Sequence, residues 1–206
     1  INNIAIGLDS MCVNQTVIKN VAMGTDTLRN STGSANTAIG YLSLAANTEG
    51  DNNTAVGAQA LCKNTTGSTN SALGGNALCA NTTGTGNAAV GYDALLLNTT
   101  ASNNTAMGLN AMRANTTGTS NVAVGKNALD ANTTGGNNIA IGDGALGANT
   151  TNTTNLAIGT SALLANNASG DNMAIGQQAA SSNLNGFHVT AIGHYSLLSN
   201  TSAQGN

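Results

Sequence analysis

The chain is poor in residues that many classes of protein need. It has no proline or tryptophan, one phenylalanine and three tyrosines, and only 6% of its 206 residues are charged. Five lysines and arginines are too few to cover a run of phosphates, which argues against nucleic-acid binding by charge. No apolar run approaches the ~18 residues of a membrane-crossing helix, so no membrane insertion is expected of this segment. The lack of aromatic side chains also argues against an ordinary globular core.

A short repeat fills the sequence instead. Its anchor is Asn-x-Ala-aliphatic-Gly, as in residues 36–40 and 53–57. The anchor glycines follow one another at steps of 17 residues, except for one step of 16 between Gly24 and Gly40. Alanine is present in every anchor, the aliphatic residue is Ile, Val, Leu or Met, and the leading Asn is replaced once, by Val189. The anchor glycines are Gly7, Gly24, Gly40, Gly57, Gly74, Gly91, Gly108, Gly125, Gly142, Gly159, Gly176 and Gly193.

A second pattern follows each anchor glycine. Three residues later comes a small residue, then usually Leu, as in Ala60-Leu61, and seven residues after the glycine comes Asn, as in Asn64. A unit of this length is too short for a helical hairpin and fits one coil of a β-solenoid. The sequence therefore predicts an all-β fold, a parallel β-solenoid of about twelve 17-residue coils, with residues 1–206 as a single array.

The residue types of the unit suit such a coil. Asn and Gly adopt the positive φ angles that its corners require. The absence of proline is consistent, because interior strands donate their N–H groups to the neighbouring coils. Asn side chains stacked in successive coils are expected to form hydrogen-bonded ladders.

The strand of each unit is apolar on both faces. In the segment 38–40, Ile39 is expected to point one way, and Ala38 and Gly40 the other. We therefore predict that its own coil covers one face and another chain covers the other, in a homo-oligomer, most simply a trimer. The alternative is a monomer with a smooth exposed alanine column. The residues assigned to the core and oligomer strands are Ala38, Ile39, Ala55, Val56, Ala89, Val90, Ala123, Val124, Ala140 and Ile141.

The anchor followed by Ala-Leu or Ser-Leu resembles the head repeat of trimeric autotransporter adhesins, the YadA-like head. It is also similar to the Asn-Thr-Ala-Ile-Gly arrays of phage tail fibres. The resemblance covers all twelve units. It implies a left-handed parallel β-roll with three chains around one axis, at a cell surface or on a virion, attaching to a host-surface receptor or glycan. The period here is longer than in the adhesins, and we recognise no neck, coiled-coil stalk, membrane anchor or signal peptide.

The two ends of the sequence add a further expectation. The first unit begins at Asn3, and Asn206 opens a thirteenth unit. This pattern suggests a slice of a longer repeat protein, or a subunit that stacks end to end in a filament.

Glycosylation sequons recur near one place in the unit. Modified, they would form a stripe of sugars along one edge, as in a glycan-coated filament. The alternative is that Asn-Thr-Thr-Gly is only a turn sequence, with the Asn and Thr side chains bonding their own backbone. The candidate asparagines are Asn14, Asn30, Asn64, Asn81, Asn98, Asn115, Asn132, Asn149 and Asn200, with Asn52, Asn103, Asn152 and Asn167 outside this column or overlapping it.

The three cysteines, Cys12, Cys62 and Cys79, each lie five residues after an anchor glycine. Cys62 and Cys79 fall in adjacent coils, ~4.8 Å apart, within the range of a disulfide. Stacked parallel neighbours rarely have suitable Cβ geometry, and free thiols are the alternative. No Cys/His spacing indicates zinc, and no metal or cofactor is expected.

Nothing in the sequence indicates catalysis. The acidic residues are scattered, and none lies close to His188 or His194 in the sequence. We therefore predict a non-enzymatic extracellular fibre segment for attachment, an adhesin head or a tail-fibre shaft. The alternatives are a glycan-coated filament subunit and a carbohydrate- or ice-binding solenoid. The column of Thr37, Thr54 and Thr105 is interrupted by Ile4 and other aliphatic residues, which argues against an ordered ice-binding face.

Overall fold

A computed structural model describes residues 2–12, 17–166, 170–199 and 201 of the chain. The chain divides into two compact units, residues 1–103 and residues 104–206. Each unit is a stack of short coils, called rungs here. Within the described residues, secondary structure consists of three-residue strands and turns, and no helix is long and apolar enough to cross a membrane.

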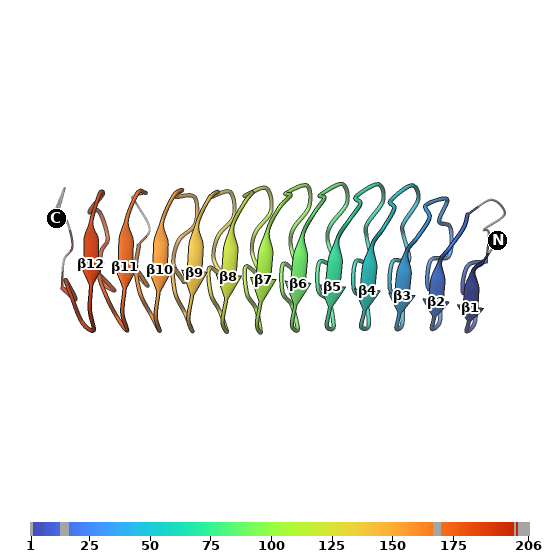
Figure 1. Ribbon diagram of the computed structural model, residues 1–206, viewed down its shortest axis with the longest axis horizontal. Coiled ribbons are helices and arrows are strands. Elements are labelled where there is room, and N and C mark those ends of the chain that lie inside the picture. Colours follow the sequence, from blue (N-terminus) through green and yellow to red (C-terminus); the bar gives the residue numbers. More distant parts are fainter. Residues whose placement is uncertain (1, 13–16, 167–169, 200, 202–206) are drawn as a thin grey trace. The chain divides into compact units, whose positions relative to one another are not determined.

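The first unit contains six strands, one in each rung (Figure 1). They are β1 (Ile4–Ile6), β2 (Val21–Met23), β3 (Thr37–Ile39), β4 (Thr54–Val56), β5 (Ser71–Leu73) and β6 (Ala88–Val90). The second unit is built the same way. Its strands are β7 (Thr105–Met107), β8 (Val122–Val124), β9 (Ile139–Ile141), β10 (Leu156–Ile158), β11 (Met173–Ile175) and β12 (Thr190–Ile192).

Neighbouring strands in each unit pair in parallel and in register. Ala55 is paired with Ala38 on one side and with Ala72 on the other. In the second unit, Ala140 lies in the same way between Ala123 and Ala157. The 17-residue period therefore places equivalent residues side by side in adjacent rungs. The predicted all-β parallel solenoid is confirmed in both units.

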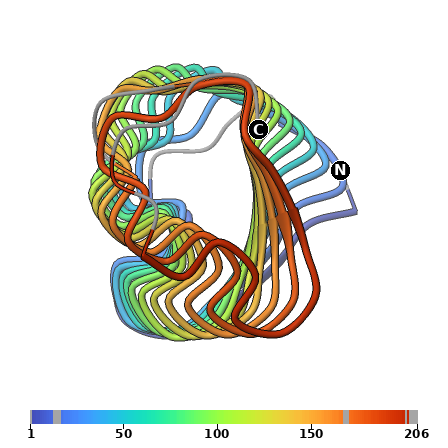
Figure 2. The same ribbon diagram turned by 90° about the vertical axis from the view of Figure 1, so that its left-hand side faces the viewer.

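The interior of a rung holds few and mostly small side chains. In the fourth rung, Asn53, Ala55, Ala60, Leu61 and Asn64 are fully buried. Figure 2 looks along the stack, where successive rungs of the second unit, coloured green to red, follow nearly the same outline. The leucine is the one large apolar side chain of this set, and two asparagines share the interior with it. The core therefore combines aliphatic packing with buried amides.

The backbone turns sharply after each strand. Gly57 has φ 136°, and a Cβ added to it would lie 2.4 Å from the carbonyl oxygen of Gly74. Only glycine fits such a position without movement of the backbone. The strands end before this residue, at the aliphatic position. The expectation that Gly40 continues the strand alternation was therefore wrong, because its φ of 126° turns the chain.

The turn segment that follows contains a feature absent from the sequence prediction. Gln59 and Leu61 have φ of 60° and 51°, so a buried leucine adopts the left-handed conformation. Such a conformation costs ~1–2 kcal/mol in a residue with a Cβ. Burial of the side chain offsets this, since a buried leucine contributes ~1.5–3 kcal/mol. The backbone bonds Cys62 N–H to Gln59 O and Asn64 N–H to Leu61 O close the consecutive turns at 3.3 and 3.1 Å.

Two ladders of buried asparagines run along each unit. In the anchor ladder, the Oδ1 of Asn36 accepts the backbone N–H of Asn53 at 2.9 Å. In the turn ladder, the Nδ2 of Asn64 donates to Asn47 Oδ1 at 2.8 Å. The carbonyl of Gly67 joins the two, accepting from the Nδ2 of Asn53 at 2.9 Å and of Asn64 at 2.8 Å. The predicted amide ladders are confirmed, and the buried amides have partners, as buried polar groups require.

Candidate functional site

The outer side of the strands is largely apolar. It consists of the two residues that flank the central alanine in each strand, and it is called the strand face here. Leu73 in the first unit is 42% exposed, and Met107 in the second is 45% exposed. Within β1–β12 this face holds aliphatic residues, threonine, serine and alanine, with no charged side chain. Within each unit, the strands therefore present an uncharged and largely aliphatic surface to the outside.

The structure separates the residues assigned to the core and oligomer strands. The alanines Ala38, Ala55, Ala89, Ala123 and Ala140 are fully buried within their own rungs. The aliphatic residues belong to the strand face. Ile39, Val56 and Val124 are half-buried there, and Val90 and Ile141 are exposed. One side of each strand therefore packs inside its rung and the other lies on the surface.

The described asparagines of the main sequon column lie inside the molecule. Asn64, Asn81, Asn98, Asn115, Asn132 and Asn149 are each 0% exposed. They are the members of the turn ladder. In Asn132, for example, the Nδ2 that would carry a sugar donates to Asn115 Oδ1 at 2.8 Å and to Gly135 O at 3.0 Å. A glycan on these atoms has no room in the folded rung. Asn14, Asn167 and Asn200 lie outside the described residues.

Asn30 differs from the rest of its column. The rung between Gly24 and Gly40 is one residue shorter, and Ser31 takes the buried ladder position. The Nδ2 of Asn47 donates to the Ser31 hydroxyl at 2.9 Å. This displaces Asn30 to the surface, where it is exposed. Asn52 and Asn103 are also exposed, both with positive φ. These three sequons are accessible in the folded chain.

Cys62 and Cys79 are free thiols in the structure, half-buried at equivalent positions of adjacent rungs. A side-chain hydrogen bond with Cys79 and the charge of Lys63 lower the pKa of Cys62 to about 7, although burial opposes the shift. The same bond, burial and the charge of Cys62 raise the pKa of Cys79. A disulfide between these residues stays a prediction.

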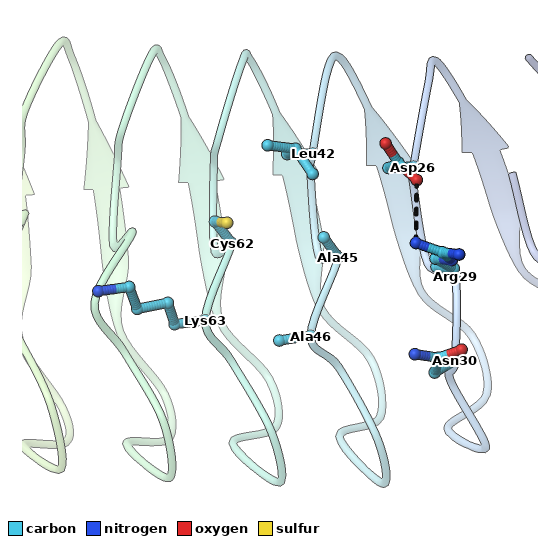
Figure 3. Close-up of a pocket in the computed structure, with 8 residues that line it drawn as sticks. All are labelled: Asp26, Arg29, Asn30, Leu42, Ala45, Ala46, Cys62 and Lys63. Atoms are coloured by element: carbon cyan, nitrogen blue, oxygen red, sulfur yellow. Dashed lines mark ion pairs between the residues drawn. The ribbon is translucent and has the colours of Figure 1, made fainter. Parts of the chain in front are cut away.

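A hollow of about 390 Å³ lies beside Cys62 (Figure 3). Its lining includes Arg29, Ala45, Ala46 and Lys63. Arg29 belongs to the rung before that of Ala45, and its guanidinium is 3.6 Å from a carboxylate oxygen of Asp26. Lys63 belongs to the rung after that of Ala45, and Figure 3 shows its amine directed away from Arg29. The hollow was not predicted from the sequence, although two successive alanines between longer side chains could have indicated it.

His188 has an acidic neighbour that the sequence analysis did not anticipate. Its Nε2 is 3.9 Å from Asp171 Oδ2, because the two residues occupy equivalent positions in adjacent rungs. The Thr154 hydroxyl donates to the other carboxylate oxygen of Asp171 at 2.6 Å. All three residues are exposed. The threonine bonds the carboxylate and not the imidazole, so the arrangement does not activate the hydroxyl as a nucleophile.

Other chemical groups are sparse in the described part of the chain. No cluster of three or more His, Cys, Asp or Glu side chains that could hold a metal ion is found there. Burial raises the pKa of Asp130, against backbone hydrogen bonds and the charge of Arg113, which lower it. Thr37, Thr54 and Thr105 lie half-buried on the strand face beside aliphatic residues.

Comparison of the chain with protein-family models, with curated proteins and with solved structures finds no match.

Proposed function

We propose that the chain is a structural segment of an extracellular fibre for attachment, at a cell surface or on a virion. Copies of the chain pack through their strand faces, most simply as three chains around one axis in a left-handed roll. The segment performs no catalysis. It holds a binding tip away from a surface or itself forms the adhesive filament.

The uncharged strand face is the observation that carries this proposal. Covering the exposed part of a side chain such as Leu73 or Met107 contributes a part of the ~1.5–3 kcal/mol that complete burial provides. An aliphatic residue that is exposed or half-buried recurs on this face in every rung, so such contributions are repeated along each unit. Threonine, serine and alanine fill the remaining positions and are small enough for close approach. A second copy of the same face offers a matching surface at the same period.

The hydrogen bonds that run between rungs suit a load-bearing role. The N–H of Thr54 donates to Asn70 O at 2.8 Å, and that of Gly57 to Ile39 O at 2.8 Å. The asparagine ladders add side-chain bonds in the same direction. Pulling two rungs apart would have to break these bonds together. The resemblance of the anchor to adhesin heads and phage fibres supports a role in attachment.

The oligomeric state tests the proposal. We expect the wild-type chain to sediment as a trimer at micromolar concentration. A double variant with Leu73→Lys and Val90→Lys should sediment as a smaller species with unchanged circular dichroism. The matched control is Leu97→Lys, which changes a leucine that is 43% exposed and outside the strand face.

A stable wild-type monomer would overturn the proposal. A trimer that tolerates both strand-face lysines would overturn the assignment of this face. Negative-stain images of the native assembly should show thin fibres projecting from a cell or particle, and particles without fibres would contradict the attachment role.

A further inference from the structure

Cys62 and Cys79 occupy one column of residues, five positions after successive anchor glycines. In stacking order, this column contains Arg29, Ala45, Cys62 and Cys79. Backbone bonds connect these rungs next to the cysteines: Ala46 N–H donates to Cys62 O, and Lys63 N–H donates to Cys79 O, both at 3.0 Å. Cys62 therefore has a second thiol on one side and a small alanine on the other.

The hollow gives access to Cys62 from the alanine side. Ala45 and Ala46 leave space that longer residues fill elsewhere in the same columns, such as Leu96 and Leu97. Arg29 stands at the far rim, with 52% of its side chain exposed. The space therefore adjoins a thiol at one end and a guanidinium at the other (Figure 3).

The two thiols differ in their chemical character. Because of the hydrogen bond with Cys79 and the charge of Lys63, the pKa of Cys62 falls to about 7, so it is thiolate at neutral pH to a greater extent than an ordinary cysteine. Cys79 is the protonated partner, since the same hydrogen bond raises its pKa. The thiolate is the form that attacks disulfides.

We propose that Cys62 and Cys79 form a redox pair: Cys62 attacks a small carboxylate-bearing disulfide in the hollow, and Cys79 then completes a cross-link between neighbouring rungs. This inference does not depend on the proposed fibre function. Arg29 at the rim lies 3.6 Å from Asp26 Oδ1, and its guanidinium has further N–H donors from which the carboxylate of the disulfide accepts.

The chemistry balances in two exchange steps. The Cys62 thiolate attacks one sulfur of the disulfide R–S–S–R, forming Cys62–S–S–R and releasing R–S⁻. Cys79 loses its proton to solvent and attacks the Cys62 sulfur, forming the Cys62–Cys79 disulfide and releasing the second R–S⁻. Two protein thiols are oxidised and one small disulfide is reduced to two thiols.

The column order favours the second step. Thiol–disulfide exchange needs the attacking, central and leaving sulfurs in a line. Cys79 lies on one side of Cys62, and the hollow over Ala45 lies on the other, so the leaving group occupies the space opposite the attacking thiol. The pKa of Cys79 also falls after the first step, because Cys62 is then no longer an anion.

The experiment treats the fully reduced chain with oxidised glutathione at pH 7, traps the remaining thiols by alkylation and maps the products by mass spectrometry. In the wild type we expect the Cys62–Cys79 disulfide. In Cys79→Ser the reaction should stop at glutathione attached to Cys62. Cys12 is the internal control, since it has the same position in its rung but Arg29 and not cysteine in the next one, so it should form only a mixed disulfide.

The initial rate at Cys62 should exceed that of an unstructured cysteine peptide by about threefold, which is the gain in thiolate fraction reduced by the lower nucleophilicity of a more acidic thiol. A Cys62 rate equal to that of the peptide would overturn the proposal. So would a wild-type chain in which glutathione accumulates on Cys62 while Cys79 stays a thiol.

A second variant tests the hollow. Ala45→Leu fills the space with a residue that the same column already contains at Leu96 and Leu164. We expect slower exchange with glutathione disulfide and unchanged alkylation of Cys62 by iodoacetamide, a smaller reagent. Ser181→Leu, in the same column of the second unit, should change neither rate. An unchanged glutathione rate in Ala45→Leu would show that the disulfide does not enter through the hollow.

Discussion

The side-chain nitrogen of Asn81 lies 2.7 Å from the side-chain oxygen of Asn64, one rung away. The same nitrogen donates to Gly84 O at 3.0 Å, and Asn81 Oδ1 accepts from Asn98 Nδ2 at 2.8 Å. All of these side chains are fully buried. A residue type that is ordinary in a surface turn is therefore a structural part of the interior.

Asn81→Ala should destabilise the fold strongly. The change removes the hydrogen bonds that Asn81 donates to Asn64 Oδ1 and Gly84 O and the one that it accepts from Asn98 Nδ2, and a buried polar group that loses its partner costs ~1–3 kcal/mol. We expect a loss of about 2–5 kcal/mol in the free energy of unfolding, measured by denaturant titration. Asn30→Ala is the control and should change stability by less than ~0.5 kcal/mol. Equal effects in the two variants would contradict the role of the turn ladder.

Glycans should distinguish the buried sequons from the exposed ones. In a glycosylating host, the folded and secreted chain should carry sugar at Asn30 or Asn52 and none at Asn81, because a glycan on a buried ladder nitrogen prevents its two hydrogen bonds. Peptide mapping of the native product checks this. Sugar at Asn81 in folded protein would contradict the ladder geometry.

Gly74 and Gly144 should respond differently to a methyl group. A Cβ on Gly74 would lie 2.5 Å from Gly91 O at φ +137°, whereas one on Gly144 would be 3.7 Å from the nearest atoms at φ +65°. We expect Gly74→Ala to cost about 2–4 kcal/mol and Gly144→Ala about 1 kcal/mol. Thermal melts of both variants give the comparison, and a well-tolerated Gly74→Ala would show that the rungs can separate locally.

Leu95→Ala should cost about 2–5 kcal/mol, because it removes the large apolar side chain that is fully buried in its rung and leaves a cavity. Leu95 is fully buried. Leu97, two residues later, is 43% exposed, and Leu97→Ala should change the free energy of unfolding by less than ~0.5 kcal/mol. Chemical denaturation of the two variants at the same protein concentration measures the difference.

Asp130→Asn should raise stability slightly at neutral pH. Because burial raises the pKa of Asp130, folding favours its protonated form, and the charged form opposes folding above the pKa of the unfolded chain. The gain should stay within ~0.5 kcal/mol, since the group is partly exposed. It should disappear as the pH falls and the wild-type carboxyl becomes protonated. Melting temperatures of both proteins at pH 7 and pH 3 measure this, and a loss of stability at pH 7 would mean that the attraction to Arg113 exceeds the burial penalty.

The repeat predicted the parallel rungs because a fixed period places equivalent residues in register. It also predicted the amide ladders, since Asn recurs at two fixed positions. It did not predict the left-handed conformation of Leu61, because local preference disfavours that conformation and only burial within the rung offsets it. The buried sequon column follows from the same turns, which direct Asn64 inward.

Contacts between rungs were harder to derive for single residues than for columns. His188 and Asp171 are not neighbours in the sequence, but they are separated by one repeat period. Aligning the repeats would therefore have paired them. The hollow beside Cys62 exists because Ala45 and Ala46 have small side chains. A missing side-chain volume is harder to recognise in a sequence than a charged residue. Each strand was predicted to be apolar on both sides. In the structure, Ala55 is buried on the inner side and Leu73 is exposed on the outer side.

The in-register pairing of Ala38, Ala55 and Ala72 has an evolutionary consequence. Within each unit, the 17-residue rungs meet their neighbours through equivalent backbone contacts, so duplicating or deleting one 17-residue segment of the gene lengthens or shortens the unit by a single step while keeping this pairing. The reach of such a molecule can therefore drift by recombination while its cross-section stays constant.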